Sequence, residues 1–165
     1  MERSSRVRRI RGPGTGTDGP RGDVATSMAF FVDVTVRGYE LDTQGHLNRA
    51  VYPQYAEHAR WSLLRAAGLP QEKLLAGGVG PVALEVTVKF LRERHDDERA
   101  RVTCQFVYGS GKTFEVVQKI IKEDGTVAAE VTGVAGMLEL AARRLIADPA
   151  GHLASLAGDP DLLSV

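Results

Sequence analysis

The residues with the greatest chemical capability lie close together at positions 42 to 48, which read Asp-Thr-Gln-Gly-His-Leu-Asn. The carboxylate of Asp42 can attack a carbonyl carbon itself or activate a water molecule to do so. His46 can donate a proton to a departing group, and Gln44 can position water or the substrate. Gly45 permits a sharp turn and a close approach of the substrate to the backbone. We therefore predict Asp42, His46 and Gln44 as the catalytic residues.

The same residue types also have structural interpretations. A loop aspartate such as Asp42 often caps the helix that follows it, and a histidine such as His46 is often hydrogen-bonded beneath a turn. Their spacing ahead of a long helix favours catalysis at Asp42. The chain has one cysteine and shows no metal-ligand spacing, because its other histidines are scattered: His58, His95 and His152. We therefore predict no metal site.

A long helix is expected directly after this polar segment. Apolar residues recur at helical spacing from Arg49 to Ala67, and Asn48 is a good N-cap. Gly68 followed by Pro70 is a typical helix stop. Because Pro53 is tolerated only in a first turn, the regular helix is expected to begin a few residues after Asn48.

The first turn of that helix is a candidate oxyanion site. Helix N-termini carry backbone N–H groups without intrahelical partners and a partial positive charge, both of which stabilise a developing oxyanion. We expect the N–H groups around Asn48, Arg49 and Ala50 to take this role, with Gly45 shaping the approach.

The remainder of the chain predicts strands, because apolar and polar residues alternate with period two. Charged or glycine-containing turns separate the later strands. A loop is expected over 69–81, and a short helix over 149–157 with Asp148 as its N-cap. One strand, one long helix and four antiparallel strands predict an α+β fold in which a curved sheet covers the helix. The expected strands are 30–36, 82–90, about 102–108, 114–122 and 126–140.

The composition predicts a soluble protein without affinity for nucleic acid or membrane. Of its 165 residues 43% are apolar, and the formal net charge is zero. No run approaches the length of a membrane span. The single cysteine fits a reducing compartment, and residues 1–27 lack the apolar core of a signal peptide. We expect a cytoplasmic protein.

Residues 1–27 differ in composition from the rest of the chain. They hold six arginines against three acids, so this segment carries +3 and the remainder −3. We interpret it as a disordered basic extension, although a nucleic-acid-binding arm is an alternative. The folded domain is then expected over 28–165, starting at Met28.

The polar segment and the helix together resemble a known family. Asp-x-x-Gly-His-Leu-Asn, followed by x-Ala-Val-Tyr and a long helix, resembles the hotdog-fold thioesterases of the 4-hydroxybenzoyl-CoA and acyl-ACP type over about residues 30–156. The resemblance implies a curved sheet of about five strands wrapped around one central helix. It also implies hydrolysis of an acyl-CoA or acyl-ACP thioester, no cofactor, and a homodimer or tetramer. In bacterial acyl-CoA members the catalytic acid stands three residues before the glycine, which is Asp42 here.

The resemblance is incomplete at three positions. The plant acyl-ACP pattern Asp-x-Asn-x-His-Val-Asn-Asn has asparagine where this chain has Gln44 and Arg49. Another branch of the family carries a catalytic glutamate on the helix, eight residues after the glycine, where this chain has Pro53. A loop acid is therefore expected to act, as nucleophile or as general base.

Two other functions stay open on the same fold. Hydratases and dehydratases of this fold carry a pattern similar to Asp-x-Asn-Pro-x-His. That pattern has one more residue between the acid and the histidine than this chain has between Asp42 and His46, and it includes a proline that this chain lacks. Both differences count against this function. A non-catalytic acyl-thioester-binding protein has no need of an acid at position 42.

Two residues outside the polar segment are candidate substrate contacts. Tyr52 is a pocket-wall candidate on the helix. Lys112 lies in Gly-Ser-Gly-Lys-Thr, which looks like a phosphate-binding loop but has Phe106 where that motif requires its first glycine. A hairpin turn is therefore expected. In hotdog dimers the corresponding edge lies near the thiol carrier, so Lys112 is a candidate contact for a phosphate of coenzyme A or phosphopantetheine.

Overall fold

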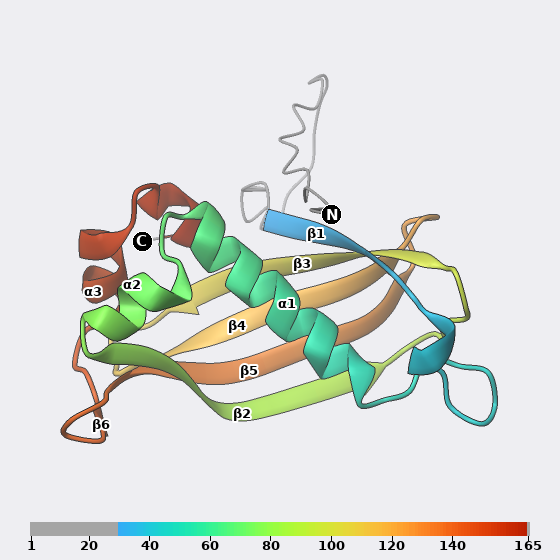
Figure 1. Cartoon of the computed structure of the whole chain (residues 1–165), viewed down its shortest axis with the longest axis horizontal. Coiled ribbons are helices and arrows are strands. Elements are labelled where there is room, and N and C mark those ends of the chain that lie inside the picture. The colour runs from blue at the N-terminus through green and yellow to red at the C-terminus, as the bar shows by residue number, and fades with distance from the viewer. Residues whose placement is uncertain (1–29, 165) are drawn as a thin grey trace, which may run out of the picture.

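The computed structural model describes residues 30–164, and the expectations for residues 1–27 and for Met28 lie outside this range. Five long strands form one antiparallel sheet in the order β1-β3-β4-β5-β2, and the helix α1 crosses one face of it (Figure 1). This arrangement confirms the expected α+β hotdog architecture. The strands are β1 Phe30–Thr35, β2 Val79–Phe90, β3 Arg99–Tyr108, β4 Thr113–Lys122 and β5 Val127–Glu139.

The three central strands of the sheet are consecutive in sequence, whereas the two edge strands come from earlier in the chain. Short turns join β3, β4 and β5 as neighbours, whereas β1 pairs with β3 and β2 pairs with β5. The register of β2 shifts between Ala83 and Glu85, which marks a β-bulge. A two-residue strand, β6 Arg144–Leu145, adds to β5 and was not expected from the sequence.

Helix α1 spans Val51–Ala66, so it begins a few residues after Asn48 as predicted, but Asn48 is not its N-cap. The residue before its first turn is Ala50, and no side chain of the described residues caps the helix there. The side chain of Asn48 instead accepts a hydrogen bond from the Ala50 N–H at 3.0 Å, before the helix begins. The predicted stop is correct, because Gly68 has a φ of +79° and a Cβ there would lie 3.0 Å from the Gly158 nitrogen.

Residues 30–164 contain four helical segments shorter than α1. Helix α2 Gln71–Ala76 replaces the loop expected over 69–81, because Leu74 is fully buried and anchors one turn. Helix α3 Pro149–Leu156 confirms the predicted one, with Asp148 accepting a hydrogen bond from the Gly151 N–H at 2.9 Å. Figure 1 shows α2 and α3 near the C-terminal end of α1, while the polar segment lies at the other end. The remaining segments are the 3-10 turns η1 Gly38–Glu40 and η2 Pro160–Leu163.

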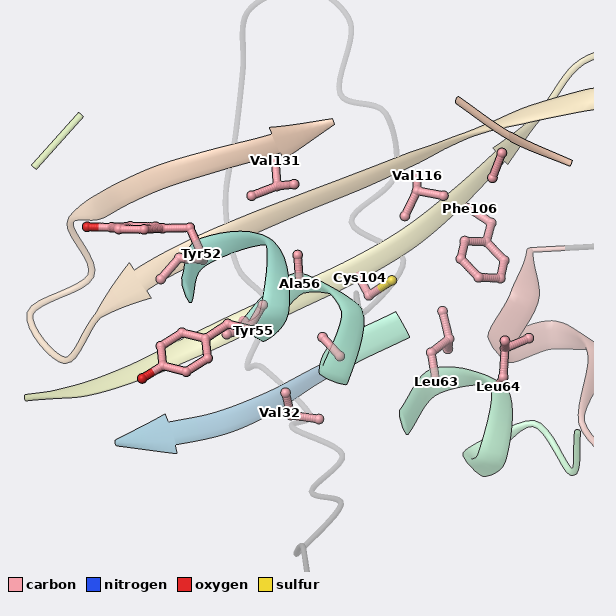
Figure 2. Packing of buried hydrophobic residues seen from close by; sticks show 14 of the residues in the cluster. Val32, Tyr52, Tyr55, Ala56, Leu63, Leu64, Cys104, Phe106, Val116 and Val131 are labelled. Atoms are coloured by element: carbon pink, nitrogen blue, oxygen red, sulfur yellow. The ribbon is translucent and has the colours of Figure 1, made fainter. Parts of the chain in front are cut away.

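The core lies between α1 and the sheet (Figure 2). Ala56 and Leu63 of the helix are buried with Cys104, Phe106 and other side chains of the central strands. Burying a large aliphatic or aromatic side chain contributes about 1.5–3 kcal/mol, so this layer supplies most of the stability. Among the described residues, no helix has the length and apolarity that crossing a bilayer requires.

Candidate active site

The polar segment forms a compact loop of residues 41–48, called here the Asp42 loop, which closes on its own aspartate. Asp42 Oδ1 accepts hydrogen bonds from the backbone N–H groups of Gln44 at 2.8 Å and His46 at 3.1 Å. The Asp42 N–H donates to the His46 carbonyl at 2.8 Å, and Gly45 turns the chain with a φ of +77°. The glycine is therefore needed for its backbone conformation.

These hydrogen bonds set the charge state of Asp42. The N–H of Gln44, and then that of His46, favour the carboxylate and hold the pKa of Asp42 below its ordinary value of 3.8. The side chain is exposed, so burial offers little opposition. Asp42 is thus an ionised group with a fixed orientation at neutral pH.

Two strong anchors hold the Asp42 loop to the domain. The Leu47 N–H donates to the Arg94 carbonyl at 2.8 Å, and the Asn48 N–H donates to the Glu40 carbonyl at 2.9 Å. The Glu40 carboxylate in turn accepts a 2.5 Å hydrogen bond from the Tyr55 hydroxyl of α1. Desolvation, and then this hydrogen bond, raise the pKa of Tyr55, so the phenol remains a donor. The loop is therefore fixed from both sides.

Arg94 is a buried cation beneath the loop that sequence reasoning missed. Its side chain is fully buried, with Nη2 donating to the Arg99 carbonyl at 2.7 Å. Its Nε lies 3.3 Å from a carboxylate oxygen of Glu98, which also pairs with Lys122 at 3.4 Å. An arginine in a charged stretch gives no sequence signal of burial.

An open cleft of about 550 Å³ runs beside the Asp42 loop. The loop and the start of α1 form one wall, and the end of β2 with the following segment forms the other. Tyr52 packs edge-to-face on Phe90 with ring centroids 5.1 Å apart, which joins the two walls. The lining residues are Asp42, His46, Leu47, Asn48, Arg49, Tyr52, Phe90, Leu91, Arg92 and Glu93.

The structure brings together most, but not all, of the residues predicted from the sequence. Those on the cleft wall are Asp42, His46, Asn48, Arg49 and Tyr52. Gln44 and Gly45 form the turn of the loop without lining the cleft.

Within a single subunit, Lys112 lies far from the cleft. It lies in the turn that joins β3 to β4, whereas the Asp42 loop contacts Arg94, close to where β3 begins. These positions are at opposite ends of a strand of roughly 30 Å. A role for Lys112 at this site stays a prediction that requires a second subunit.

The expected oxyanion donors are mostly occupied, which corrects the sequence prediction. The N–H of Asn48 is bound to Glu40, and that of Ala50 to the Asn48 side chain at 3.0 Å. The asparagine side chain binds a backbone N–H group that would otherwise be free to bind an oxyanion. Of the three predicted groups, the Arg49 N–H is the one without an acceptor among residues 30–164.

A group of three potential metal ligands lies at the rim of the cleft. His46 Nε2 is 3.2 Å from one carboxylate oxygen of Glu93, and His95 Nε2 is 3.6 Å from the other. Linear spacing predicted no such group, because Glu93 and His95 reach His46 only when the segment after β2 folds against the loop.

A second, smaller cavity of about 140 Å³ lies further along α1. It is predominantly apolar, with Glu57 and Arg60 as its charged members. Three consecutive residues of β2 line it, Pro81, Val82 and Ala83, immediately before the β-bulge. The other lining residues are Trp61, Leu64, Phe106, Phe114, Ala135, Met137 and Leu153.

Comparison with known proteins identifies the class. Residues 36–156 match the model of the Thioesterase-like superfamily. Because this match covers most of the chain, the chain belongs to that superfamily.

Individual relatives agree with this assignment. The chain is 30% identical over 98 residues to the long-chain acyl-CoA thioesterase FadM of Escherichia coli, a match to 59% of this chain and 74% of that protein. It is 38% identical over 71 residues, 43% of its length, to the chloroplastic acyl-acyl carrier protein thioesterase ATL3 of Arabidopsis thaliana. That match spans only 37% of the plant protein.

Solved structures share the fold. The probable thioesterase YbaW of Escherichia coli superposes with a TM-score of 0.68 at 25% identity, over 76% of this chain and 94% of that one. A hypothetical protein of Staphylococcus aureus in complex with CoA gives 0.71 at 20% identity, over 82% and 87% respectively. At the latter identity the likeness shows the fold alone.

Proposed function

We propose that this protein hydrolyses an acyl-CoA or acyl-ACP thioester to a free acid and a thiol, with Asp42 as the catalytic carboxylate. The observation that carries the proposal is an ionised carboxylate, oriented by two backbone N–H groups, on the wall of an open cleft. Membership of the superfamily and the names of the relatives support thioester chemistry.

The reaction follows from this arrangement. Either Asp42 or a water that it deprotonates adds to the thioester carbonyl carbon, and negative charge develops on the oxygen. The Arg49 N–H, at the entry to α1, donates to that oxygen. The C–S bond then breaks, and His46 supplies a proton to the departing thiolate. If Asp42 attacks directly, water afterwards hydrolyses the resulting anhydride.

The rest of the site suits the two ends of such a substrate. Arg49 and Arg92 on the cleft wall offer cations to the phosphates of coenzyme A or phosphopantetheine. The apolar cavity beside Trp61 accepts part of the acyl group. Its lining on α1 begins at Glu57, five residues beyond Tyr52, which corresponds to roughly 7–8 Å along the helix axis.

A homodimer, or a tetramer of such dimers, fits the exposed surface of β2. This strand is an edge of the sheet, and Leu84, Val86 and Phe90 are each about half exposed. Apolar side chains along an unpaired strand edge are a liability that pairing with a second copy removes. A cytoplasmic location belongs to the same proposal.

Replacing Asp42 by asparagine tests the proposal. The amide keeps an oxygen that can accept the two backbone hydrogen bonds, so we expect the free energy of unfolding to change by less than about 1 kcal/mol. Turnover should fall at least about a hundredfold, mainly in kcat, because general-base assistance supplies roughly 10²–10⁴. The measurement is free-thiol release from a panel of acyl-CoA and acyl-ACP substrates.

A matched variant separates a loop acid from a helix acid. Glu57 is an exposed glutamate on α1 in ion-pair contact with Arg60 at 3.8 Å. Because it also lines the proposed acyl cavity, Glu57→Gln can change KM, but it should leave kcat nearly unchanged. Wild-type hydrolysis by Asp42→Asn would falsify the assignment of Asp42.

The dependence of kcat/KM on pH gives a second test, because the direction of the Asp42 pKa shift determines the expected profile. The pKa of Asp42 in the folded protein is below its ordinary value. The hydrogen bonds to its carboxylate therefore stabilise the fold at any pH above the pKa of the unfolded chain. This stabilisation is lost as the pH falls through the pKa of the folded protein. Ionisation of Asp42 should therefore produce no acid limb in kcat/KM between pH 5 and pH 8. A limb near pH 6.5, where imidazoles ordinarily titrate, would assign the essential base to a histidine.

A further inference from the structure

The group formed by His46, Glu93 and His95 has a geometry that the proposed hydrolysis does not explain. Its ligand atoms all lie within 4.8 Å of one another. Glu93 stands in the middle, with one oxygen 3.2 Å from His46 Nε2 and the other 3.6 Å from His95 Nε2. The two imidazole rings meet edge-to-face with their centroids 5.1 Å apart.

The two nitrogen–oxygen distances, 3.2 and 3.6 Å, are close to those between donors around a small divalent ion. Zinc binds histidine nitrogen and carboxylate oxygen at about 2.0–2.2 Å in a tetrahedron. Two donors of such a tetrahedron are then roughly 3.3–3.5 Å apart, close to the two nitrogen–oxygen distances observed. Two imidazoles and one carboxylate also make the ligand set of catalytic zinc sites, which keep the fourth position open for water.

The backbone holds the three ligands in place before any ion binds. The hydrogen bond between the Leu47 N–H and the Arg94 carbonyl, at 2.8 Å, ties the residue after His46 to the residue between Glu93 and His95. Glu93 and His95 are two residues apart, and the 3.6 Å between the His95 Nε2 and a Glu93 carboxylate oxygen places their side chains together. Burial of the Arg94 side chain fixes that segment.

We propose that His46, Glu93 and His95 form a binding site for a divalent transition-metal ion such as Zn²⁺, with water completing the coordination. The site cross-links the Asp42 loop to the segment between β2 and β3. It also occupies Nε2 of His46, which lines the cleft together with Glu93. Where the proposed hydrolysis holds, a bound ion withdraws His46 from proton transfer and lowers turnover.

Direct metal binding by the full-length chain tests the proposal without reference to activity. Metals are first removed with EDTA, and the protein is exchanged into chelator-free buffer. Titration calorimetry should then show one Zn²⁺ ion bound per chain. Zn²⁺ should also raise the melting temperature, because the ion binds the folded state. Glu93→Gln and His95→Ala should each weaken the Zn²⁺ affinity at least about tenfold, since second-sphere changes alone cost 10–100-fold. Both side chains are exposed, so the variants should fold, and melting in EDTA checks this.

A control histidine outside the group makes the test specific. His58 is an exposed residue of α1 that does not belong to the cluster, and His58→Ala should bind Zn²⁺ as the wild type does. Equal Zn²⁺ affinities in the wild type and in His95→Ala would overturn the proposal. So would an absence of binding at millimolar Zn²⁺, which would leave Glu93 as a hydrogen-bond acceptor for two histidines. Neither result bears on Asp42, whose test is thiol release without metal.

Discussion

Strands β2 and β3 share a period-two apolar pattern but lie in different environments. In β3 the inward residues Val102, Cys104 and Phe106 are at most 3% exposed. In β2 the apolar residues Leu84 and Val86 are 53% and 49% exposed. Strand β3 has neighbours on both sides and α1 across its face, whereas β2 is an edge strand whose regular register is interrupted by a bulge.

The difference shows what an alternating pattern can and cannot say. Alternation identifies the face of a strand that must be covered, but not the element that covers it. For β3 the cover is α1 of the same chain. For β2 we propose a second subunit, so the two strands should respond differently to substitution.

The largest effect is expected inside β3. Phe106→Ala should lower the free energy of unfolding by about 3–5 kcal/mol, because it removes a buried ring and leaves a cavity. The adjacent Val107 points to the opposite face and is 43% exposed, so Val107→Ala should cost less than about 1 kcal/mol. Urea unfolding of the two variants measures the difference. Similar costs at both positions would mean that the two faces of β3 are equally covered.

The next effect concerns assembly through β2. Val86→Arg should weaken self-association at least about a hundredfold while each chain still folds, because the charge of one copy would meet its symmetry mate. Sedimentation across a range of concentrations measures this, and Val107→Arg places the same charge on the outer face of β3 as a control. Unaltered association in Val86→Arg, or monomeric wild-type protein, would contradict the proposed interface.

The smallest effect is chemical, at the single cysteine. Burial raises the pKa of Cys104 to about 12, so its thiol stays protonated and unreactive at pH 8. A thiol reagent should therefore modify the wild type only as fast as the chain unfolds. Val86→Cys adds a second thiol, which should react rapidly in dilute protein and slowly once β2 is covered. Fast labelling of the wild type would show that the inner face of β3 opens readily.

Sequence reasoning located most of the fold because the decisive patterns are local. Alternation identified the buried face of β3, and Gly68 marked the end of α1 correctly. Helix α2 was missed because the glycines that follow it favour a loop, whereas its formation depends on the burial of Leu74 against the domain. Strand β6 is two residues long and has no pattern to recognise.

The candidate site was predictable to the extent that it lies in one segment. Asp42, His46 and Asn48 were found through their spacing, and all three line the cleft. Glu93 and Arg94 were not found, because their approach to the Asp42 loop depends on how the connection after β2 folds back. The oxyanion donors were overestimated, since hydrogen bonds within the loop already use two of them.

The strand order has a consequence for the way the chain is made. The edge strands β1 and β2, with the Asp42 loop and α1 between them, leave the ribosome before the strands with which they pair. The meander of β3, β4 and β5 forms from short-range contacts, whereas both edges need partners distant in sequence. The segment that bears the Asp42 loop is therefore synthesised before the meander and completed after it. Until β5 emerges, β2 remains without its neighbour in the sheet, and its apolar residues are open to chaperones and to other nascent chains.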